Sequence, residues 1–301
     1  MKRIRFCTRK DQIPRLAMSL VVRDEIELIS ANIAFHASQG VDTFWIMDNG
    51  STDGTREKLD ELKQDYDIAV FDQPDDSFEQ RVWATNLALM ARQSGKADYI
   101  ISNDADEFWF SKTGSLKDQC KKRSPVVAAP RTNMLPLADQ IQRPDYRFYH
   151  SVLNVVAPPE IGEITTDPTA AVPMMLRKMP AKILCSLTGL HEVKTGNHSV
   201  KHEAGRPVTS EDLHIYHFPV RSFEQFAKHV EFAKKRFARE LPSSNKGSSW
   251  HKRRWVAQME LGCLKNEWTS FSLDAKQAAT LEAAGVIQRD ETIRHFVEAI
   301  W

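Results

Sequence analysis

Short apolar runs alternate with helical segments through the first third of the chain. The runs predict strands, because each is brief and is bounded by polar or turn-forming residues. They are Leu16–Val22, Thr43–Met47, Ile68–Phe71 and a run that begins at Tyr99. Between them apolar residues recur every three or four positions, which is the period of a helix. Parallel strands need such crossover helices, so the pattern predicts an α/β fold with a mostly parallel central sheet.

The pattern changes after Phe110. A further strand is predicted over Val126–Arg131, and short strands are predicted between Lys182 and His202. Residues 133–181 are rich in proline and poor in periodicity, which is typical of a long functional or mobile loop. An alternating run over Leu213–Pro219 predicts one more strand, which includes His217.

A one-sided apolar stripe predicts an amphipathic helix that begins near Ser222. The stripe consists of Phe223, Phe226, Val230, Ala233, Phe237 and Leu241. The opposite face is basic and carries Lys228, Lys234, Lys235, Arg236 and Arg239. Residues 242–249 have the composition of a linker, and helical segments follow them. We therefore expect a main domain over residues 1–241, divided into halves 1–110 and 111–241, and a helical extension over 242–301.

Composition excludes several classes of protein. The chain of 301 residues is 42% hydrophobic and 27% charged, so it can bury a substantial core. The net charge of +1 provides no electrostatic footprint for nucleic acid, and no such partner is expected. The cysteines lie far apart without a CxxC pair, which disfavours a zinc cage and a disulfide framework.

The expected location is the cytoplasm. Widely spaced cysteines fit a reducing compartment. The basic amino-terminal residues lack the apolar core of a secretory signal. No run approaches the roughly 18 apolar residues of a membrane span. The basic face of the amphipathic helix adds a second expectation, peripheral contact with the inner face of a membrane, although most such faces are simply solvated.

Three carboxylates follow the apolar run that begins at Tyr99: Asp104, Asp106 and Glu107. In open α/β sheets, ligands bind beyond the carboxyl ends of the strands. On an extended backbone Asp104 and Asp106 point the same way and can share one cation, whereas Glu107 points to the other side. Acidic residues after a strand are also common in solvated loops and as helix caps. The aromatic residues 108–110 would suit a solvated loop poorly, so the pattern favours a metal site.

Three motifs lie at the ends of the first, second and fourth predicted strands: SLVVRDE, DNGSTDGT and NDADEFW. In this order and spacing they resemble the nucleotide-sugar half of a family 2-like glycosyltransferase with the GT-A fold and its DxD motif. The resemblance covers Ala17 to Phe110, with a weaker echo as far as Phe226. Neither GxGxxG after the first strand nor GxxxxGK[ST] is present, which disfavours dinucleotide and P-loop chemistry.

This resemblance implies a three-layer α/β/α fold with helices at the carboxyl terminus. It also implies transfer of a sugar from a nucleoside-diphosphate sugar, with a UDP-sugar as the first expectation. The acceptor would be a glycan, a lipid-linked molecule or another hydroxyl compound, as in polysaccharide biosynthesis.

The resemblance also implies roles for the acidic motif. Asp106 corresponds to the aspartate that meets the metal, and Asp104 to the one that contacts the ribose or the metal's water shell. Family members often add a histidine from the carboxyl-terminal side of the sheet. His217 is the first choice here and His198 the second, and a purely structural role is the alternative for each. Oxygen ligands suit Mg²⁺ or Mn²⁺, and an added imidazole favours Mn²⁺.

Contacts with the nucleotide are expected at the ends of the first two strands. Asp48 resembles the carboxylate that reads the base, and it also suits a turn-forming role. The backbone at Val22 and Arg23 lies where the family binds the ring of the nucleotide base. Glu25 belongs to the same polar segment at the end of the first strand. An asparagine replaces the second aspartate of the family's DDGSTDGT, which leaves the base preference open. Arg81 is expected to face either the diphosphate or solvent.

An inverting transfer needs a general base that takes the proton of the acceptor hydroxyl. The candidates beyond the metal motif are Glu192, Glu203, Glu211 and Asp212. Glu192 is favoured because it lies beside His191, and Asp212 is retained as the second catalytic candidate. Each of them is also suited to be an ordinary solvated carboxylate.

Two other functions fit the same sequence. A metal–carboxylate site at a strand end also serves nucleotidyl or phosphoryl transfer, in which the attack is at phosphorus. A non-catalytic module that binds a nucleotide sugar or a glycan would keep the fold without the chemistry.

Overall fold

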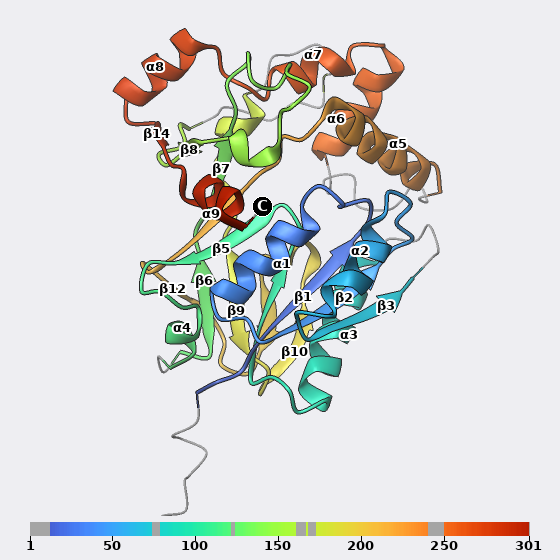
Figure 1. The fold of residues 1–301 in the computed structure, drawn as a ribbon, viewed down its shortest axis with the longest axis vertical. Coiled ribbons are helices and arrows are strands. Elements are labelled where there is room, and N and C mark those ends of the chain that lie inside the picture. The colour runs from blue at the N-terminus through green and yellow to red at the C-terminus, as the bar shows by residue number, and fades with distance from the viewer. Residues whose placement is uncertain are drawn as a thin grey trace, which may run out of the picture.

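The computed structural model describes residues 13–73, 79–121, 124–160, 167, 173–239 and 250–300. A seven-stranded sheet forms the centre of the molecule, in the strand order β12-β6-β9-β4-β1-β2-β3 (Figure 1). Its strands are β1 (Leu16–Val22), β2 (Thr43–Asp48), β3 (Ile68–Asp72), β4 (Tyr99–Asn103), β6 (Val126–Ala129), β9 (Lys182–Ser186) and β12 (Val208–Thr209). Strands β4, β1, β2 and β3 are adjacent in the sheet and run parallel to one another. Strand β9 runs antiparallel to both of its neighbours, β4 and β6. The predicted mostly parallel sheet is confirmed.

Helices cover both faces of this sheet. The crossover helices are α1 (Ile29–Ser38), α2 (Thr55–Leu62) and α3 (Gln80–Gln93). Leu16 and Leu20 of β1 join the core cluster that contains residues of α1 and α2, whereas Ala17 joins the cluster that contains α3. This alternation buries both faces of the strand, and each fully buried leucine contributes roughly 2 kcal/mol. The predicted three-layer α/β/α fold is therefore confirmed.

A second, five-stranded sheet in the order β14-β8-β7-β13-β5 stands beside the first. Its strands are β5 (Glu107–Ser111), β7 (Arg131–Leu135), β8 (Leu153–Val155), β13 (Leu213–His217) and β14 (Ile287–Arg289). Residue pairing places His217 of β13 opposite Glu107 of β5 on one side and opposite Asn133 of β7 on the other. This sheet delivers His217 to the carboxyl end of β4.

The prediction that residues 133–181 form a long structureless loop is wrong for the described part of that range. It contains the end of β7, the strand β8, and the 3₁₀ turns η2 (Phe148–His150) and η3 (Met174–Leu176). Leu153 and Val155 are buried in a core cluster with Leu135. Long-range pairing with β7 and β14 orders this segment despite its prolines.

The remaining elements are α4 (Lys117–Lys121), β10 (Leu190–Val193), η4 (Thr195–Asn197), β11 (Val200–His202), α5 (Phe223–Arg239), α6 (Trp250–Glu260), α7 (Leu264–Thr269), α8 (Ala275–Ala283) and α9 (Thr292–Ile300). The helix predicted from Ser222 is confirmed as α5. Leu241 and the predicted linker over 242–249 lie outside the described residues. The carboxyl-terminal segment is tied to the rest of the fold, because β14 pairs with β8 and Phe296 of α9 lies 5.0 Å from Phe35 of α1 between ring centroids.

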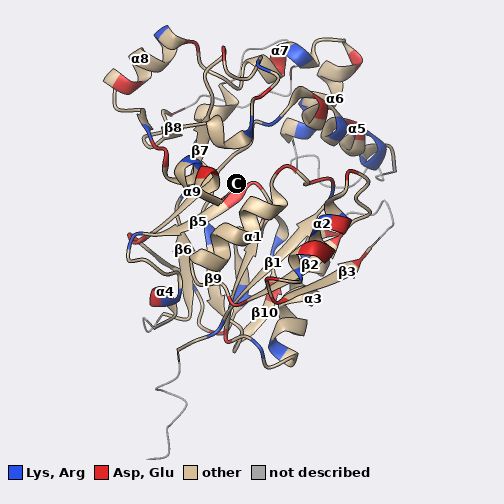
Figure 2. Ribbon diagram, in the orientation of Figure 1, with Lys and Arg blue, Asp and Glu red and all other residues tan. Residues whose placement is uncertain are grey.

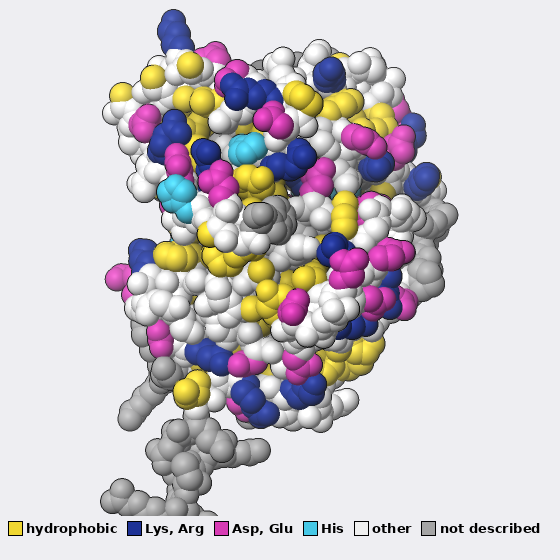
Figure 3. Space-filling model, in the orientation of Figure 1, with side chains coloured by type: hydrophobic (Ala, Val, Ile, Leu, Met, Phe, Trp, Pro, Cys, Tyr) yellow, Lys and Arg dark blue, Asp and Glu magenta, His cyan; other side chains and the backbone are white. Residues whose placement is uncertain are grey.

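Basic residues line α5 and α6, which lie at one end of the molecule (Figure 2). Two of these lysines have acidic partners, because Lys228 pairs with Glu224 at 3.1 Å and Lys234 with Glu260 at 3.0 Å. On the face drawn in Figure 3, basic and acidic side chains are interspersed. Within the described part of the chain, no helix combines the length and apolar character needed to cross a membrane. Peripheral membrane contact stays a prediction.

Candidate active site

A tight turn at Ala105 and Asp106 connects β4 to β5 and carries the acidic motif. Asn103 fixes this turn from within, because its Nδ2 donates to the Glu107 carbonyl at 3.0 Å and its Oδ1 accepts from Trp109 Nε1 at 2.9 Å. These bonds join the end of one strand to the start of the next, so the position of Asp106 is set by buried backbone rather than by a free loop.

Two polar residues of α1 support the same turn from the side. Asn32 Nδ2 donates to the carbonyls of Ala105 and Glu107, at 2.8 and 2.9 Å. His36 accepts the Trp109 backbone N–H at Nε2, 3.0 Å away. Both side chains are fully buried, and burial lowers the pKa of His36 to about 4. Neither residue was predicted to support the site, although an Asn and a His four positions apart on the apolar face of a predicted helix are an available signal.

Three potential metal ligands meet at this turn: Asp106, Glu107 and His217. Their ligand atoms all lie within 4.8 Å of one another, and His217 Nε2 is 3.3 Å from Asp106 Oδ2. Burial raises the pKa of Asp106, but the opposing effects of His217, Arg221 and Lys182 are larger and hold that pKa well below its usual range. Asp106 is therefore ionised and able to bind a cation.

Glu107 points into this cluster, so the expectation that it would point to the other side is wrong. The turn at Ala105 and Asp106 interrupts the extended backbone on which that expectation depended. Glu107 is fully buried, donors from Arg131 and Lys182 surround it, and the Lys182 Nζ lies 3.0 Å from its Oε2. Burial raises the pKa of Glu107, and the two cations outweigh that effect and lower it overall.

Asp104 is held at the edge of the cluster by three other side chains. Its Oδ2 accepts from Lys182 at 2.6 Å, and its Oδ1 accepts from Gln80 at 3.2 Å and from Asn197 at 3.3 Å. Burial and the neighbouring carboxylates raise the pKa of Asp104, and the Lys182 ammonium offsets part of that rise. Its side chain is 34% exposed, so Asp104 can still meet a ligand that enters from solvent.

The donor set fits a divalent cation. Asp106 supplies a carboxylate oxygen and His217 an imidazole nitrogen, and a set that includes a nitrogen suits Mn²⁺ better than an all-oxygen set would. Glu107 belongs to the same cluster but has cationic partners in Arg131 and Lys182. Glu107 Oε2 is buried and accepts no hydrogen bond among the described residues, although the Lys182 ammonium is close. The positive charges of the buried residues Lys182 and Arg131 balance two of the three carboxylates in the motif. The negative charge of the third carboxylate is left for a metal ion to balance.

The predicted nucleotide-binding residues end neighbouring strands at the same edge of the sheet. Val22 and Asp48 are paired at the ends of β1 and β2. Asp48 is buried and accepts from the Ser51 hydroxyl at 2.5 Å, which is the turn-forming role weighed for it. Arg23 donates to the Asn49 carbonyl at 3.0 Å, and its guanidinium lies 4.2 Å from the centroid of the Phe232 ring. These contacts bring the tip of β1 against α5.

Glu25 forms a buried ion pair with Arg221 across the same edge. Arg221 Nη2 also lies 3.3 Å from His229 Nδ1 on α5. Burial raises the pKa of Glu25 to about 7, although the charge of Arg221 opposes the rise. Arg221 follows His217 by four residues and lowers the pKa of Asp106, so a positive charge that the sequence analysis missed lies near the acidic motif.

The two candidate bases lie in different places. Glu192 on β10 accepts from Arg81 and Lys194, each at 2.5 Å, and these bonds lower its pKa. Arg81 is the sequence neighbour of Gln80, whose side chain donates to Asp104. Asp212 precedes β13, whereas His217 ends it, and the structure does not bring Asp212 to the cluster.

His198, the second candidate ligand, has a structural partner. Its Nδ1 lies 3.2 Å from the carbonyl of Ala181. Burial and then the charges of Lys182 and Arg131 lower its pKa to about 4. His198 is not part of the cluster of ligand atoms that includes His217.

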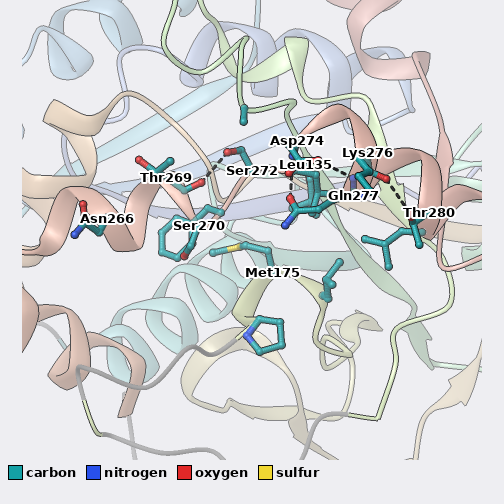
Figure 4. A pocket seen from close by; sticks show the side chains of 16 residues that line it. Leu135, Met175, Asn266, Thr269, Ser270, Ser272, Asp274, Lys276, Gln277 and Thr280 are labelled. Carbon is teal, nitrogen blue, oxygen red and sulfur yellow. Dashed lines mark hydrogen bonds between the residues drawn. The ribbon is translucent and has the colours of Figure 1, made fainter.

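A cavity of about 750 Å³ lies apart from the carboxylate cluster, between η3 and the segment from α7 to α8 (Figure 4). Leu135, Met175, Phe271 and Leu273 line it with apolar surface. Asp274 at its rim accepts the Gln277 backbone N–H and caps α8, so its carboxylate already has a structural role. None of the three candidate metal ligands lines this cavity.

No family model and no curated protein matches the sequence. Among solved structures, residues 1–349 of TarS from S. aureus, in complex with UDP-GlcNAc, share 13% identity at a TM-score of 0.44, covering 86% of this chain and 73% of that one. The mannosyltransferase PcManGT from Pyrobaculum calidifontis, in complex with GDP-Man and Mn²⁺, shares 14% identity at a TM-score of 0.41, covering 92% and 80%. Likeness at this level assigns no activity, and the function must be argued from the residues of the site.

Proposed function

We propose that this chain is a metal-dependent, inverting glycosyltransferase. It would move a sugar from a nucleoside-diphosphate sugar to a hydroxyl group of a glycan or lipid-linked acceptor. The observation that carries the proposal is the convergence of Asp106, Glu107 and His217 within 4.8 Å at the end of β4. In an open α/β sheet this is the edge at which ligands bind.

The chemistry of the leaving group explains such a cluster. Cleavage of the sugar–phosphate bond leaves negative charge on the diphosphate, and a divalent ion at this site would supply the counter-charge as a Lewis acid. Asp106 and His217 are the proposed ligands, because Glu107 is already bound to Arg131 and Lys182. The imidazole favours Mn²⁺ over Mg²⁺.

The chain's own residues bind and orient the donor. Asp48 and the backbone at Val22 and Arg23 are proposed to hold the nucleotide, with Glu25 supporting the same strand end and a UDP-sugar as the first donor to test. Asp104, with 34% of its side chain exposed, is proposed to contact the ribose or the metal's water shell. Buried cations beside these carboxylates keep the edge from repelling an anionic diphosphate.

Glu192 is the proposed general base. The 2.5 Å bonds from Lys194 and Arg81 keep its carboxylate in the ionised form that can accept a proton, and because the same bonds lower its pKa they also weaken it as a base. Arg81, for which contact with the diphosphate and exposure to solvent were both expected, acts on Glu192 in this proposal. Asp212 is the weaker candidate because it lies at the far end of β13.

Calorimetric titration with UDP and with GDP, each with and without Mn²⁺, tests the binding step. We expect the wild-type protein to bind one of them with an affinity that Mn²⁺ raises at least tenfold. Asp106→Asn and His217→Ala should lose that metal-dependent gain while they retain the wild-type fold by circular dichroism. Asp139→Asn is the matched control, because Asp139 forms an exposed ion pair with Arg143.

Release of nucleoside diphosphate from donor sugars, measured with Mn²⁺ present, tests the chemical step. Turnover should require both Mn²⁺ and an intact Asp106. Release of nucleoside monophosphate or of a sugar 1-phosphate in place of nucleoside diphosphate would indicate attack at phosphorus and would overturn the proposal. So would wild-type turnover by the Asp106→Asn variant.

A further inference from the structure

The two ring nitrogens of His217 have different partners. Nε2 faces Asp106, with 3.3 Å to its Oδ2. Nδ1 faces Asn133 of the neighbouring strand β7, with 2.6 Å to its Oδ1. The parallel register of β13 and β7 places these two residues side by side, so the strands themselves maintain the contact.

The orientation of the Asn133 amide is fixed by a third residue. Asn133 Nδ2 donates to the carbonyl of Met175 in η3 at 2.8 Å. A flipped amide would place its oxygen against that carbonyl oxygen, and two acceptors would then face each other in a buried place. Asn133 is only 2% exposed, so water cannot readily compensate for such a flip. The Oδ1 atom therefore faces His217 as an acceptor.

An acceptor at Nδ1 determines which nitrogen of His217 carries the proton. With Nδ1–H donating to Asn133 Oδ1, Nε2 is the ring nitrogen that can give its lone pair to a metal ion beside Asp106. A metal ion binds a neutral imidazole through such a lone pair, and the partner of the other nitrogen sets its orientation. Without that acceptor, the ring is free to place the proton on Nε2 or to rotate.

We infer that Asn133 is a positioning residue that presents His217 Nε2 to a divalent cation shared with Asp106. The inference rests on the proposed function, because it takes His217 as a metal ligand. It adds a residue that contacts neither the metal nor the substrate and that belongs to a segment predicted to be structureless. The connection runs from Met175 through Asn133 and His217 to Asp106.

Titration of the metal alone, followed by the electron paramagnetic resonance signal of free Mn²⁺, tests the inference. Asn133→Leu removes the acceptor, and we expect Mn²⁺ affinity to fall about 10–100-fold, the usual effect of losing the partner of a metal-ligating histidine. Asn133→Asp retains an acceptor for Nδ1 and should restore most of the affinity, although its second oxygen would face the Met175 carbonyl and lower the stability of the protein. This rescue separates positioning from a purely structural role.

Asn154→Leu is the matched control. Asn154 is also buried, at 3% exposure, on the adjacent strand β8, but its Oδ1 accepts from the Thr132 hydroxyl. Its loss should lower stability without changing Mn²⁺ affinity. If Asn133→Leu does not fold, the Mn²⁺ affinity of Asn133→Asp is compared with those of the wild type and His217→Ala. The inference then requires Asn133→Asp to bind Mn²⁺ far more tightly than His217→Ala does.

The tautomer of His217 gives a second readout. Long-range ¹H–¹⁵N correlation spectra of the protein saturated with diamagnetic Mg²⁺ should show the ring proton of His217 on Nδ1 in the wild type and no longer only there in Asn133→Leu. If Asn133→Leu binds Mn²⁺ with wild-type affinity while His217→Ala loses most of its affinity, the positioning role of Asn133 is overturned and the proposed metal site is not. Unchanged Mn²⁺ affinity in both His217→Ala and Asp106→Asn would instead overturn the proposed metal site.

Discussion

Lys182 and Glu107 place their charged groups 3.0 Å apart beneath the end of β4, and both side chains are fully buried. The same ammonium group lies 2.6 Å from Asp104, and Arg131 binds the other oxygen of Glu107. Two of the three carboxylates in the acidic motif thus have permanent cationic partners within the protein. Asp106 instead faces His217, which makes it the carboxylate best placed to bind an added cation.

Replacement of Lys182 by methionine should destabilise the protein by about 3–5 kcal/mol, the usual cost of leaving a buried charge without its partner. Glu107 and Asp104 would both lose an ammonium group that is inaccessible to water. Urea unfolding at pH 7 measures the effect. Lys96→Met is the control, because Lys96 forms an exposed pair with Asp67 and should cost no more than about 1 kcal/mol. A similar small loss in both variants would contradict this account.

Stability should fall as the pH drops from about 6.5 to about 4 because of His36. Its pKa is lowered from 6.5 to about 4 in the folded protein, so the unfolded chain binds a proton that the folded chain refuses in that interval. Nδ1 donates to the Asn32 carbonyl at 2.7 Å, and Nε2 accepts the Trp109 N–H, which leaves no place for a second ring proton. The difference amounts to roughly 3 kcal/mol.

Urea unfolding at several pH values measures this loss. Other histidines that are partly buried, such as His198 and His251, also have lowered pKa values and contribute to the slope of the wild-type protein. The contribution of His36 is therefore taken as the difference between the wild type and His36→Gln, which lacks the titrating ring. Equal slopes in the two proteins would show that His36 does not titrate as described.

Asn32→Leu tests the support of the acidic turn from α1. The change keeps the approximate side-chain volume but removes the donor of two buried carbonyls, those of Ala105 and Glu107. Each unsatisfied group costs roughly 1–3 kcal/mol, so we expect a loss of at least about 2 kcal/mol in urea unfolding. Mn²⁺ affinity should fall as well, because Asp106 lies between those carbonyls. Unchanged stability would exclude this role for Asn32.

The central sheet was predictable because its signals are local. The predicted strand Leu16–Val22 has the same bounds as β1, and Thr43–Met47 differs from β2 by one residue. Each run is apolar on both faces, and a helix-period segment separates it from the next. Hydrophobic pattern and chain order together therefore fix the three-layer fold.

The second sheet was not predictable in the same way. Strands β8 and β14 have three residues each and pair across more than one hundred residues of sequence, from Leu153–Val155 to Ile287–Arg289. Segments this short have no measurable period, and their order comes from partners rather than from local preference. For this reason proline content led to the wrong expectation for residues 133–181.

The site was predicted only where the motif is contiguous. Asp104 and Asp106 are adjacent in sequence to a strong strand signal. Lys182 and Arg131 reach the site from strands predicted without regard to it, and Asn133 reaches it from a segment for which a loop was predicted. One signal was available: Lys182 opens an otherwise apolar strand, and a lysine in that place needs a buried partner. The orientation of the Glu107 side chain was predicted wrongly because a turn at residues 105–106 interrupts the alternation of side chains along an extended chain.

Glu192→Gln tests the proposed general base. The amide keeps a similar shape but cannot take a proton, so kcat for sugar transfer should fall by about 10²–10⁴-fold while Mn²⁺-dependent donor binding stays unchanged. Arg81 and Lys194 would lose their ionised acceptor. Glu61→Gln is the control, because Glu61 forms an exposed pair with Lys58 on α2. If Glu192→Gln keeps more than half of the wild-type kcat, another group must accept the hydroxyl proton, and the ion pairs around Glu192 are structural.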